Sequence, residues 1–314
     1  MKIILAAPVH PRLPHKLPLP VWQPHNFWRR ALLSLGHRVK IFRLTDSPHL
    51  KLIKTWQLKQ LINSWQPDEI FFSAGKDAVY PLKDTVFLSG VPFSILSHNE
   101  QQIGLSAKLI VTNDPTHAQD WLNHGAHRTV CLPISAIDPQ LHRPTAPIKK
   151  YQADVVFIGG LLLERQQLFL KLLKAGINLK LFGILSENFL SPKLKKIYFG
   201  PAWGKTVSQI YSSAKIILNP LPAHMPIGGN LRTFEIPGCG AFQLASRTHP
   251  NWFTNGKNIV IYQNPTDLIK KITYYLAHDS ARRRIAHAGY LRTHKDHTYL
   301  KRFHQLLKLL HASN

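Results

Sequence analysis

Apolar residues in the first half of the chain form short continuous runs that alternate with stretches of helical spacing. Residues 1–9, MKIILAAPV, have the pattern of a buried strand. The segment 26–44, NFWRRALLSLGHRVKIFRL, then predicts a helix that ends at Gly36 and a second strand from Val39. This strand, helix, strand order predicts a β-α-β unit with parallel strands.

The same alternation continues through residues 58–75, the run Gly90 to Leu96 and residues 106–135, which predicts a parallel sheet with helices on its faces. Between Asp138 and Gln152 the alternation stops, because three prolines and no apolar periodicity occur there. We interpret that stretch as a linker.

After the linker the pattern restarts. Residues 153–160, ADVVFIGG, predict a strand that ends in two glycines, and a helix and a strand follow over 164–176 and 178–183. The alternation lasts to about residue 263, and from Pro265 the patterns are all helical. The second half is therefore predicted to be another doubly wound α/β domain.

We predict an N-terminal Rossmann-like domain over residues 1–145, a C-terminal one over 146–296, and a final helix over 297–314 that packs back on the first domain. A length of 314 residues agrees with two domains. With 44% hydrophobic and 18% charged residues, the composition is that of a soluble globular protein.

The net charge of +24, from 40 Lys and Arg against 16 Asp and Glu, is the main anomaly of the composition. Residues 1–50 carry eight basic residues against one acid, and residues 251–314 carry eleven against three. Such a surface attracts polyanions, which include nucleic acid, anionic lipid and phosphate-bearing substrates.

Several site types are disfavoured by the motifs. Cys131 and Cys239 are far apart in the sequence, which agrees with a reducing cytoplasm. The 18 histidines show no helical ligand pair beside a carboxylate, so we expect most of them at the surface and no metal site. Gly238 and Gly240 follow a helix instead of a strand, and this order argues against a nicotinamide-binding fingerprint.

One candidate ligand site is the segment 226–242. Gly228 and Gly229 allow a close approach of a ligand, and Asn230 is the predicted N-cap of a helix whose amino end favours a phosphate. Arg232 supplies a forked donor, and Glu235 supplies an acceptor for vicinal sugar hydroxyls. The alternative is that Arg232 and Glu235, three residues apart, merely pair on the helix surface.

A second candidate anion site lies at Gly159 and Gly160, where a predicted strand ends, with Arg165 in the first turn of the next helix. The alternative is an ordinary strand-to-helix turn with a solvated arginine. The sequence leaves both interpretations open.

The second half resembles a known family. NLRTFEIPGCGAF, preceded by AKIILNP and followed by HKDHTYLKRFHQLL, is similar to the C-terminal half of the CgeB-like glycosyltransferases, which are related to the group 1 transferases. The resemblance spans roughly Asp154 to Leu307 and opens with VVFIGGLLLER. It implies a GT-B architecture, in which two Rossmann-like domains face each other across a cleft.

The resemblance also implies residue roles. A nucleotide-sugar donor would lie on the C-terminal domain and the acceptor on the N-terminal side. Glu235 takes the place of the glutamate that binds the donor ribose. Arg165 approximately matches the phosphate-binding basic residues of the family, and Arg232 is a further candidate for that role. A second family glutamate, eight positions earlier, is replaced here by Ile227.

We therefore expect a cytoplasmic, metal-independent glycosyltransferase that uses a UDP- or GDP-type sugar donor and no further cofactor, and that retains stereochemistry. The acceptor is expected to be anionic or lipid-linked, with peripheral association at an anionic membrane. If the reaction inverts, His10 in the first βα loop would serve as the base. The alternatives are a nucleotide-sugar epimerase and a basic nucleic-acid-binding protein on an inactive GT-B fold.

Overall fold

The computed structural model describes residues 1–8, 24–44, 50–73, 83–183 and 190–312. Its chain forms two compact units. Unit 1 comprises residues 1–135, 223–228 and 299–314, and unit 2 comprises residues 136–222 and 229–298. Each unit contains one parallel sheet with helices on both faces, so the predicted doubly wound α/β class is confirmed.

Unit 1 is built on a six-stranded sheet with the order β2-β1-β3-β4-β5-β6, in which each described pair is parallel. The strands are β1 (Lys2–Pro8), β2 (Arg38–Leu44), β3 (Glu69–Ser73), β4 (Val86–Ser89), β5 (Leu109–Thr112) and β6 (Thr129–Cys131). The helices are α1 (Pro24–Ser34), α2 (Lys51–Trp65), α3 (His98–Leu105), α4 (Pro115–Asn123) and α11 (Tyr299–His311).

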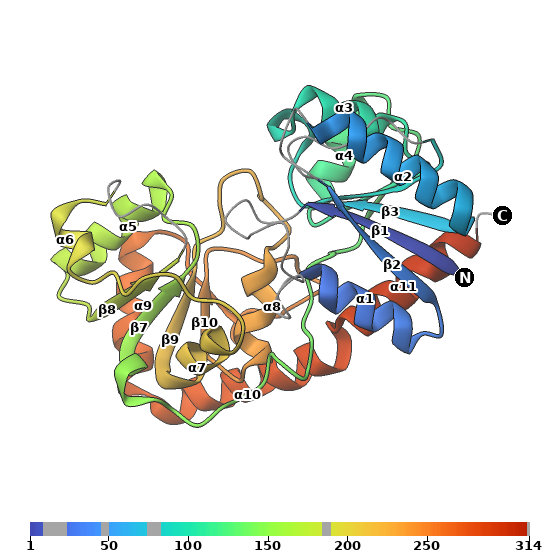
Figure 1. Cartoon of the computed structure of the whole chain (residues 1–314). Helices are drawn as coiled ribbons and strands as arrows, with labels where there is room; N and C mark the ends of the chain where they lie inside the picture. Colours follow the sequence, from blue (N-terminus) through green and yellow to red (C-terminus); the bar gives the residue numbers. More distant parts are fainter. Residues whose placement is uncertain (9–23, 45–49, 74–82, 184–189, 313–314) are drawn as a thin grey trace. The chain divides into compact units, whose positions relative to one another are not determined.

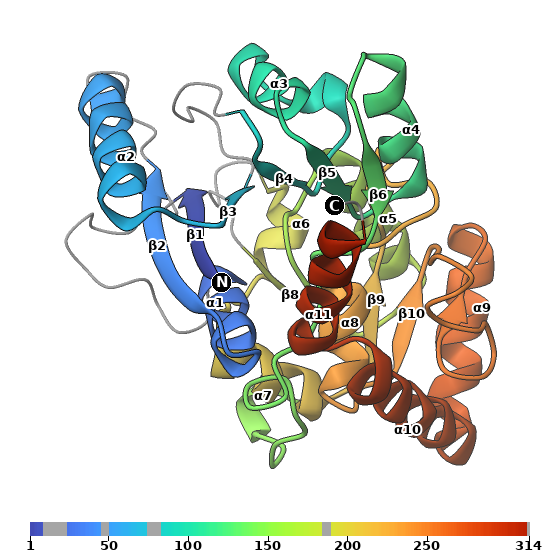
Figure 2. The ribbon, with the colours of Figure 1, turned by 90° about the vertical axis from the view of Figure 1, so that its right-hand side faces the viewer.

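The two faces of this sheet have separate aromatic cores. On one face Leu58 of α2 and Trp121 of α4 pack with Phe72 and Phe87. On the other face α11 lies beside α1, and the ring of Phe303 stacks 6.0 Å from that of Phe71 (Figures 1 and 2). Alternation of side chains along buried strands produces these two faces.

Unit 2 has a five-stranded sheet with the order β11-β10-β9-β7-β8. Its strands are β7 (Ala153–Ile158), β8 (Leu179–Phe182), β9 (Ala214–Asn219), β10 (Gln243–Ala245) and β11 (Val260–Ile261). Its helices are α5 (Leu163–Lys174), α6 (Pro192–Lys195), α7 (Lys205–Ser213), α8 (Leu231–Gly238), α9 (Pro265–Ala277) and α10 (Asp279–Asp296). Helices α5 and α9 pack on one face of the sheet, and α7 and α8 pack on the other.

The unit borders differ from the predicted domain ranges. Unit 2 begins at Ala136 and not at residue 146, because Ala136 and Ile137 are fully buried and the Ile137 amide donates to the carbonyl of His297. The segment 223–228, which follows β9 in the chain, belongs to unit 1. Within the stretch interpreted as a linker, residues 138–152, Asp138 and His142 are also buried, so that stretch is in part core structure.

One predicted strand is wrong. The run Gly90 to Leu96 contains a single 3-10 turn, Phe93–Ile95, and the strand is β4, which precedes it. Pro92 explains the error, because proline has no amide proton to donate to a sheet ladder, whereas all four residues of β4 are buried.

Candidate functional site

The carboxyl end of β7 forms a tight glycine turn. Gly159 has a φ of +152°, and a Cβ placed there would lie 2.6 Å from Nη1 of Arg232. Gly183, at the end of the neighbouring strand β8, also has a positive φ, and its Cβ would lie 1.9 Å from the carbonyl oxygen of Gly159. Glycine is required at both positions because backbone angle and space each exclude a side chain.

Arg165 is buried beside this turn, with only 4% of its surface exposed. Its Nε donates to the carbonyl of Pro220 at 3.0 Å, and its Nη1 donates to that of Gly160 at 2.8 Å. Burial, with a further contribution from the charge of Arg232, lowers the pKa of Arg165 to about 10. Arg165 is therefore not the solvated side chain of the alternative interpretation.

A second guanidinium shares the same aromatic surface. Arg232 lies 5.8 Å from the ring centroid of Phe157, and Arg165 lies 5.5 Å from it. The Nε of Arg232 is buried and has no hydrogen-bond partner among the described residues. Arg165 is buried and Arg232 is half-buried, and no carboxylate of the described residues forms an ion pair with either, so an anion bound between the two guanidiniums would be stabilised.

The amino end of α8 has the predicted cap. The Asn230 side chain accepts from the amide of Thr233 at 3.1 Å, and the Thr233 hydroxyl accepts from the amide of Asn230 at 3.2 Å. Asn219, the last residue of β9, holds the Asn230 side chain through a further hydrogen bond of 3.1 Å. The N-cap prediction is confirmed, and the side chain of Asn230 is fully used by it.

The two glycines before Asn230 have different surroundings. Gly228 lies in unit 1, where its amide donates to Oδ2 of Asp114 at 2.6 Å and the Ile227 amide donates to the same oxygen at 2.9 Å. The Gly228 amide, which was predicted to face a phosphate, thus already has a carboxylate partner. Gly229 lies in unit 2, where Thr233 and Trp252 leave no room for a side chain.

Glu235 is oriented by a histidine that the sequence analysis did not single out. Its Oε1 lies 3.2 Å from Nε2 of His142, which is 2% exposed. Nδ1 of His142 lies 3.0 Å from the Asp138 amide, which donates to it, and 3.2 Å from the Asp138 carbonyl. The amide contact favours Nδ1 as the acceptor and Nε2 as the nitrogen that carries the proton. His142 therefore donates to Glu235.

This pairing removes the alternative that Glu235 pairs with Arg232, since no ion pair joins those two residues in the described part of the chain. His142 was missed because it lies in the proline-rich stretch interpreted as a linker. The only sequence signal for His142 was a weak one, the turn-forming residue Asp138 four positions earlier. Asp138 accepts from the amide of Gln140, and this turn brings His142 back to the Asp138 amide.

A tyrosine hydroxyl lies near the same group. Tyr211 of α7 is 1% exposed, and its hydroxyl has no hydrogen-bond partner among the described residues. Burial, strengthened by the negative charge of Glu235, raises the pKa of Tyr211 well above its usual value. The Tyr211 hydroxyl therefore stays protonated and can donate a hydrogen bond.

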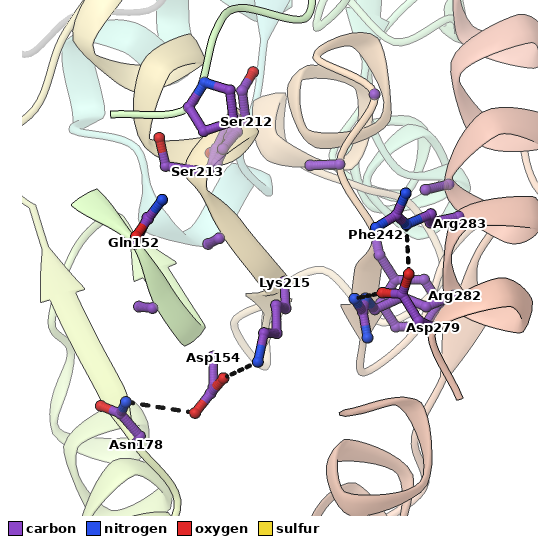
Figure 3. A pocket seen from close by; sticks show the side chains of 17 residues that line it. Gln152, Asp154, Asn178, Ser212, Ser213, Lys215, Phe242, Asp279, Arg282 and Arg283 are labelled. Carbon is purple, nitrogen blue, oxygen red and sulfur yellow. Dashed lines mark hydrogen bonds and ion pairs between the residues drawn. The ribbon is translucent and has the colours of Figure 1, made fainter. Parts of the chain in front are cut away.

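A pocket of about 800 Å³ lies at the opposite edge of the same sheet, at the amino ends of β7 and β9 (Figure 3). Its charged residues are paired with one another. Asp154 accepts from Lys215 at 2.7 Å, and Asp279 pairs with Arg282 and Arg283. Ligands of doubly wound sheets bind at the carboxyl ends of strands, so this pocket is not the candidate site.

The remaining predicted features have these outcomes. His10 lies outside the described residues. Within the described residues, no group of three or more His, Cys, Asp or Glu could hold a metal ion. Most histidines were predicted to lie at the surface, and His117, His142 and His297 are buried. Burial raises the pKa of Cys239 to about 12, so this thiol is not a nucleophile.

Over the described ranges, none of the helices is long and apolar enough to cross a membrane.

Residues 165–308 match the family described as "Glycosyl transferase-like". This match begins at Arg165 and includes Arg232 and Glu235. A search of curated proteins finds no significant match.

Solved structures share the fold over nearly the whole chain. A glycosyltransferase from Rickettsia africae ESF-5 has a TM-score of 0.68 at 12% identity, and the alignment covers 98% of this chain and 97% of that one. Anabaena Alr3699/HepE in complex with UDP-glucose also has a TM-score of 0.68 at 12% identity, with coverage of 99% and 100%. At this identity the likeness concerns the fold, which is of the GT-B type.

A UDP-N-acetylglucosamine 2-epimerase shares the fold less closely, with a TM-score of 0.51 at 9% identity and coverage of 92% and 90%. The fold alone therefore does not separate sugar transfer from sugar epimerisation.

Proposed function

We propose that this chain is a CgeB-like glycosyltransferase that moves a sugar from a nucleotide diphosphate-sugar, of the UDP or GDP type, to an acceptor. The observation that carries the proposal is the pair of guanidiniums at the glycine turn after β7, of which Arg165 is buried and Arg232 is half-buried with a buried Nε. A diphosphate supplies the negative charge that this pair lacks. The glycosyl transferase-like match over 165–308 supports the same assignment.

In this proposal unit 2 is the donor side. The diphosphate contacts Arg232 and the first amides of α8, which begins at Leu231 beside the Asn230 cap. Glu235 accepts hydrogen bonds from the two ribose hydroxyls with the carboxylate that His142 orients. Arg165 strengthens the positive field and holds the glycine turn in place.

The chemical step is departure of the nucleoside diphosphate from the sugar. Its developing negative charge is stabilised by fixed guanidinium and amide donors, so the proposed reaction needs no bound metal. We propose retention of stereochemistry, in which the acceptor hydroxyl bonds to the sugar carbon as the bond to the diphosphate breaks, and its proton passes to the departing diphosphate, so that no protein base is required. If the reaction inverts, His10 stays the proposed base.

The acceptor side is assigned to unit 1. An anionic or lipid-linked acceptor fits the net charge of +24, and we propose a cytoplasmic protein that associates peripherally with an anionic membrane. Epimerisation is the second candidate, because a UDP-N-acetylglucosamine 2-epimerase has the same fold. Conversion of a nucleotide sugar without an acceptor distinguishes the epimerase.

A ligand screen tests the proposed function. Thermal unfolding is recorded with UDP, GDP, ADP, their sugar conjugates and a nucleic-acid duplex, each with and without EDTA. We expect UDP or GDP to raise the Tm, because a ligand that binds the folded state stabilises it. Stabilisation by the duplex alone, or a nucleotide effect that EDTA removes, would contradict the donor assignment or its independence of metal.

A further inference from the structure

Helix α2 of unit 1 exposes large apolar residues in its first two turns, in addition to its buried inner side. Its inner residue Leu58 is fully buried against the sheet core of β1, β2 and β3. On the outer side Leu52 is 70% exposed, Ile53 is 52% exposed and Trp56 is 60% exposed. Single exposed apolar residues are common, but three large ones together on one helix indicate a contact surface.

These three residues form one surface, which we call the α2 apolar patch. Positions 52, 53 and 56 are neighbours on a helix because residues three and four apart lie on the same side. In both ribbon views α2 covers the β2 end of the unit 1 sheet (Figures 1 and 2). The patch therefore belongs to a single rigid element.

The surroundings of the patch are basic. Residues 38–65 contain six Lys and Arg and one acid. Lys59 is exposed on α2, and the Lys54 ammonium lies 5.6 Å from the ring centroid of Phe42, at the border between the helix and β2. Apolar side chains with lysines at their edge are the composition of a helix that lies in a membrane interface.

We propose that the α2 apolar patch docks this protein on the surface of an anionic bilayer. Leu52 and Ile53 would enter the acyl boundary, Trp56 would lie at headgroup depth, and the exposed Lys59 on the same side of α2 would face lipid phosphates. A second copy of the chain is a poorer partner, because a two-fold contact sets Lys59 against the same lysine of the other copy. The proposal does not depend on the nucleotide site.

Vesicle flotation of the full chain tests this proposal. Wild type is expected to bind phosphatidylglycerol-containing vesicles and to bind pure phosphatidylcholine vesicles at least about tenfold more weakly. The triple variant Leu52→Ser, Ile53→Ser, Trp56→Ser is expected to lose about tenfold or more of the binding. The control variant Leu291→Ser, Leu300→Ser removes two other exposed apolar residues and should bind within about twofold of wild type.

Two further measurements distinguish membrane docking from misfolding of the triple variant and from self-association. Leu52→Glu, at the most exposed position of the patch, places a negative charge against the lipid and should weaken binding about tenfold even if the triple variant does not fold. Unchanged vesicle binding by folded Leu52→Glu overturns the proposal. A lipid-free dimer of wild type that the same substitution dissociates overturns it in favour of self-association. Neither readout involves nucleotide, so failure here leaves the donor assignment untouched.

Discussion

Among the described residues, charged side chains are paired at one edge of the unit 2 sheet and unpaired at the other. At the amino edge the residues lining the 800 Å³ pocket pair with one another, as Lys215 does with Asp154. At the carboxyl edge Arg165 and Arg232 lie over one phenylalanine ring, and the buried Nε of Arg232 has no hydrogen-bond partner in the described part of the chain. The amino edge is distinguished by its pocket of 800 Å³, and the carboxyl edge is distinguished by its uncompensated positive charge.

This difference indicates which edge of the sheet can bind an anionic ligand. Paired charges must be separated before an anion can bind, and that separation costs part of the binding energy. Unpaired, partly desolvated guanidiniums already carry the desolvation cost, so an arriving diphosphate meets fixed donors. The following predictions compare the two edges directly or alter what holds the carboxyl edge in place.

The largest effect is expected for Glu235→Ala. This substitution removes a charged acceptor whose hydrogen bonds contribute roughly 1.5 to 3 kcal/mol, which corresponds to about 10- to 150-fold weaker nucleotide binding. Calorimetric titration of the folded variant with the preferred nucleoside diphosphate measures the change. An affinity equal to that of wild type would show that the ribose does not contact Glu235.

A smaller effect is expected for the loop anchor Asp114→Asn. Burial raises the pKa of Asp114, but hydrogen bonds from Thr116 and from the amides of Gly228 and Ile227 outweigh burial, so the net pKa lies below its usual value. The carboxylate therefore contributes stability that is present above its ordinary value of 3.8 and is lost as the pH falls below it.

Asp114→Asn should lower the free energy of unfolding by about 1 to 3 kcal/mol at neutral pH. The difference between wild type and variant should shrink as the solution is acidified below pH 4. Denaturant unfolding at several pH values measures it. A difference that stays constant through this range would mean that the carboxylate charge does not hold the segment 223–228.

His142→Ala should have a moderate effect on binding. The variant keeps the Glu235 carboxylate but loses the donor that orients it, which is worth about 1 kcal/mol or roughly fivefold in nucleotide affinity. His142→Gln, whose amide can still donate to Glu235, should recover part of the affinity. A purely structural role for His142 would lower the Tm of both variants and leave the dissociation constant of the folded protein unchanged.

The smallest effect is expected at the amino edge. Lys215→Ala breaks a half-exposed ion pair with Asp154, and such pairs contribute about 0 to 1 kcal/mol. Nucleotide affinity should not change. A loss of affinity comparable to that of Glu235→Ala would move the ligand to the pocket edge and reverse the comparison.

Local sequence signals predicted much of the site. The Asn230 cap, the glycine turn after β7 and the parallel strands that position them follow from capping, backbone freedom and periodicity within a few residues. The residue type and position of Glu235 indicated an acceptor for vicinal hydroxyls, and the family resemblance added its assignment to the donor ribose.

Long-range partners could not be predicted in this way. Asp114 and Gly228 are more than a hundred positions apart, and His142 lies 93 positions from Glu235, so no local pattern links them. The burial of Arg165 likewise depends on Pro220, which the chain brings back only through β9. The proline-rich residues 138–152 have the pattern of a linker, although His142, which orients Glu235, lies among them.

The most direct test of the central claim compares two arginines that differ in their surroundings. Arg232 lies at the carboxyl edge with a buried, unpartnered Nε, whereas Arg283 at the amino-edge pocket is 80% exposed and pairs with Asp279. Each is replaced by alanine, and the preferred nucleoside diphosphate is titrated calorimetrically into both folded variants. We predict that Arg232→Ala weakens binding by about tenfold or more and that Arg283→Ala stays within about twofold of wild type. Unchanged affinity in Arg232→Ala, or a larger loss in Arg283→Ala, would contradict the assignment of the nucleotide to the carboxyl edge.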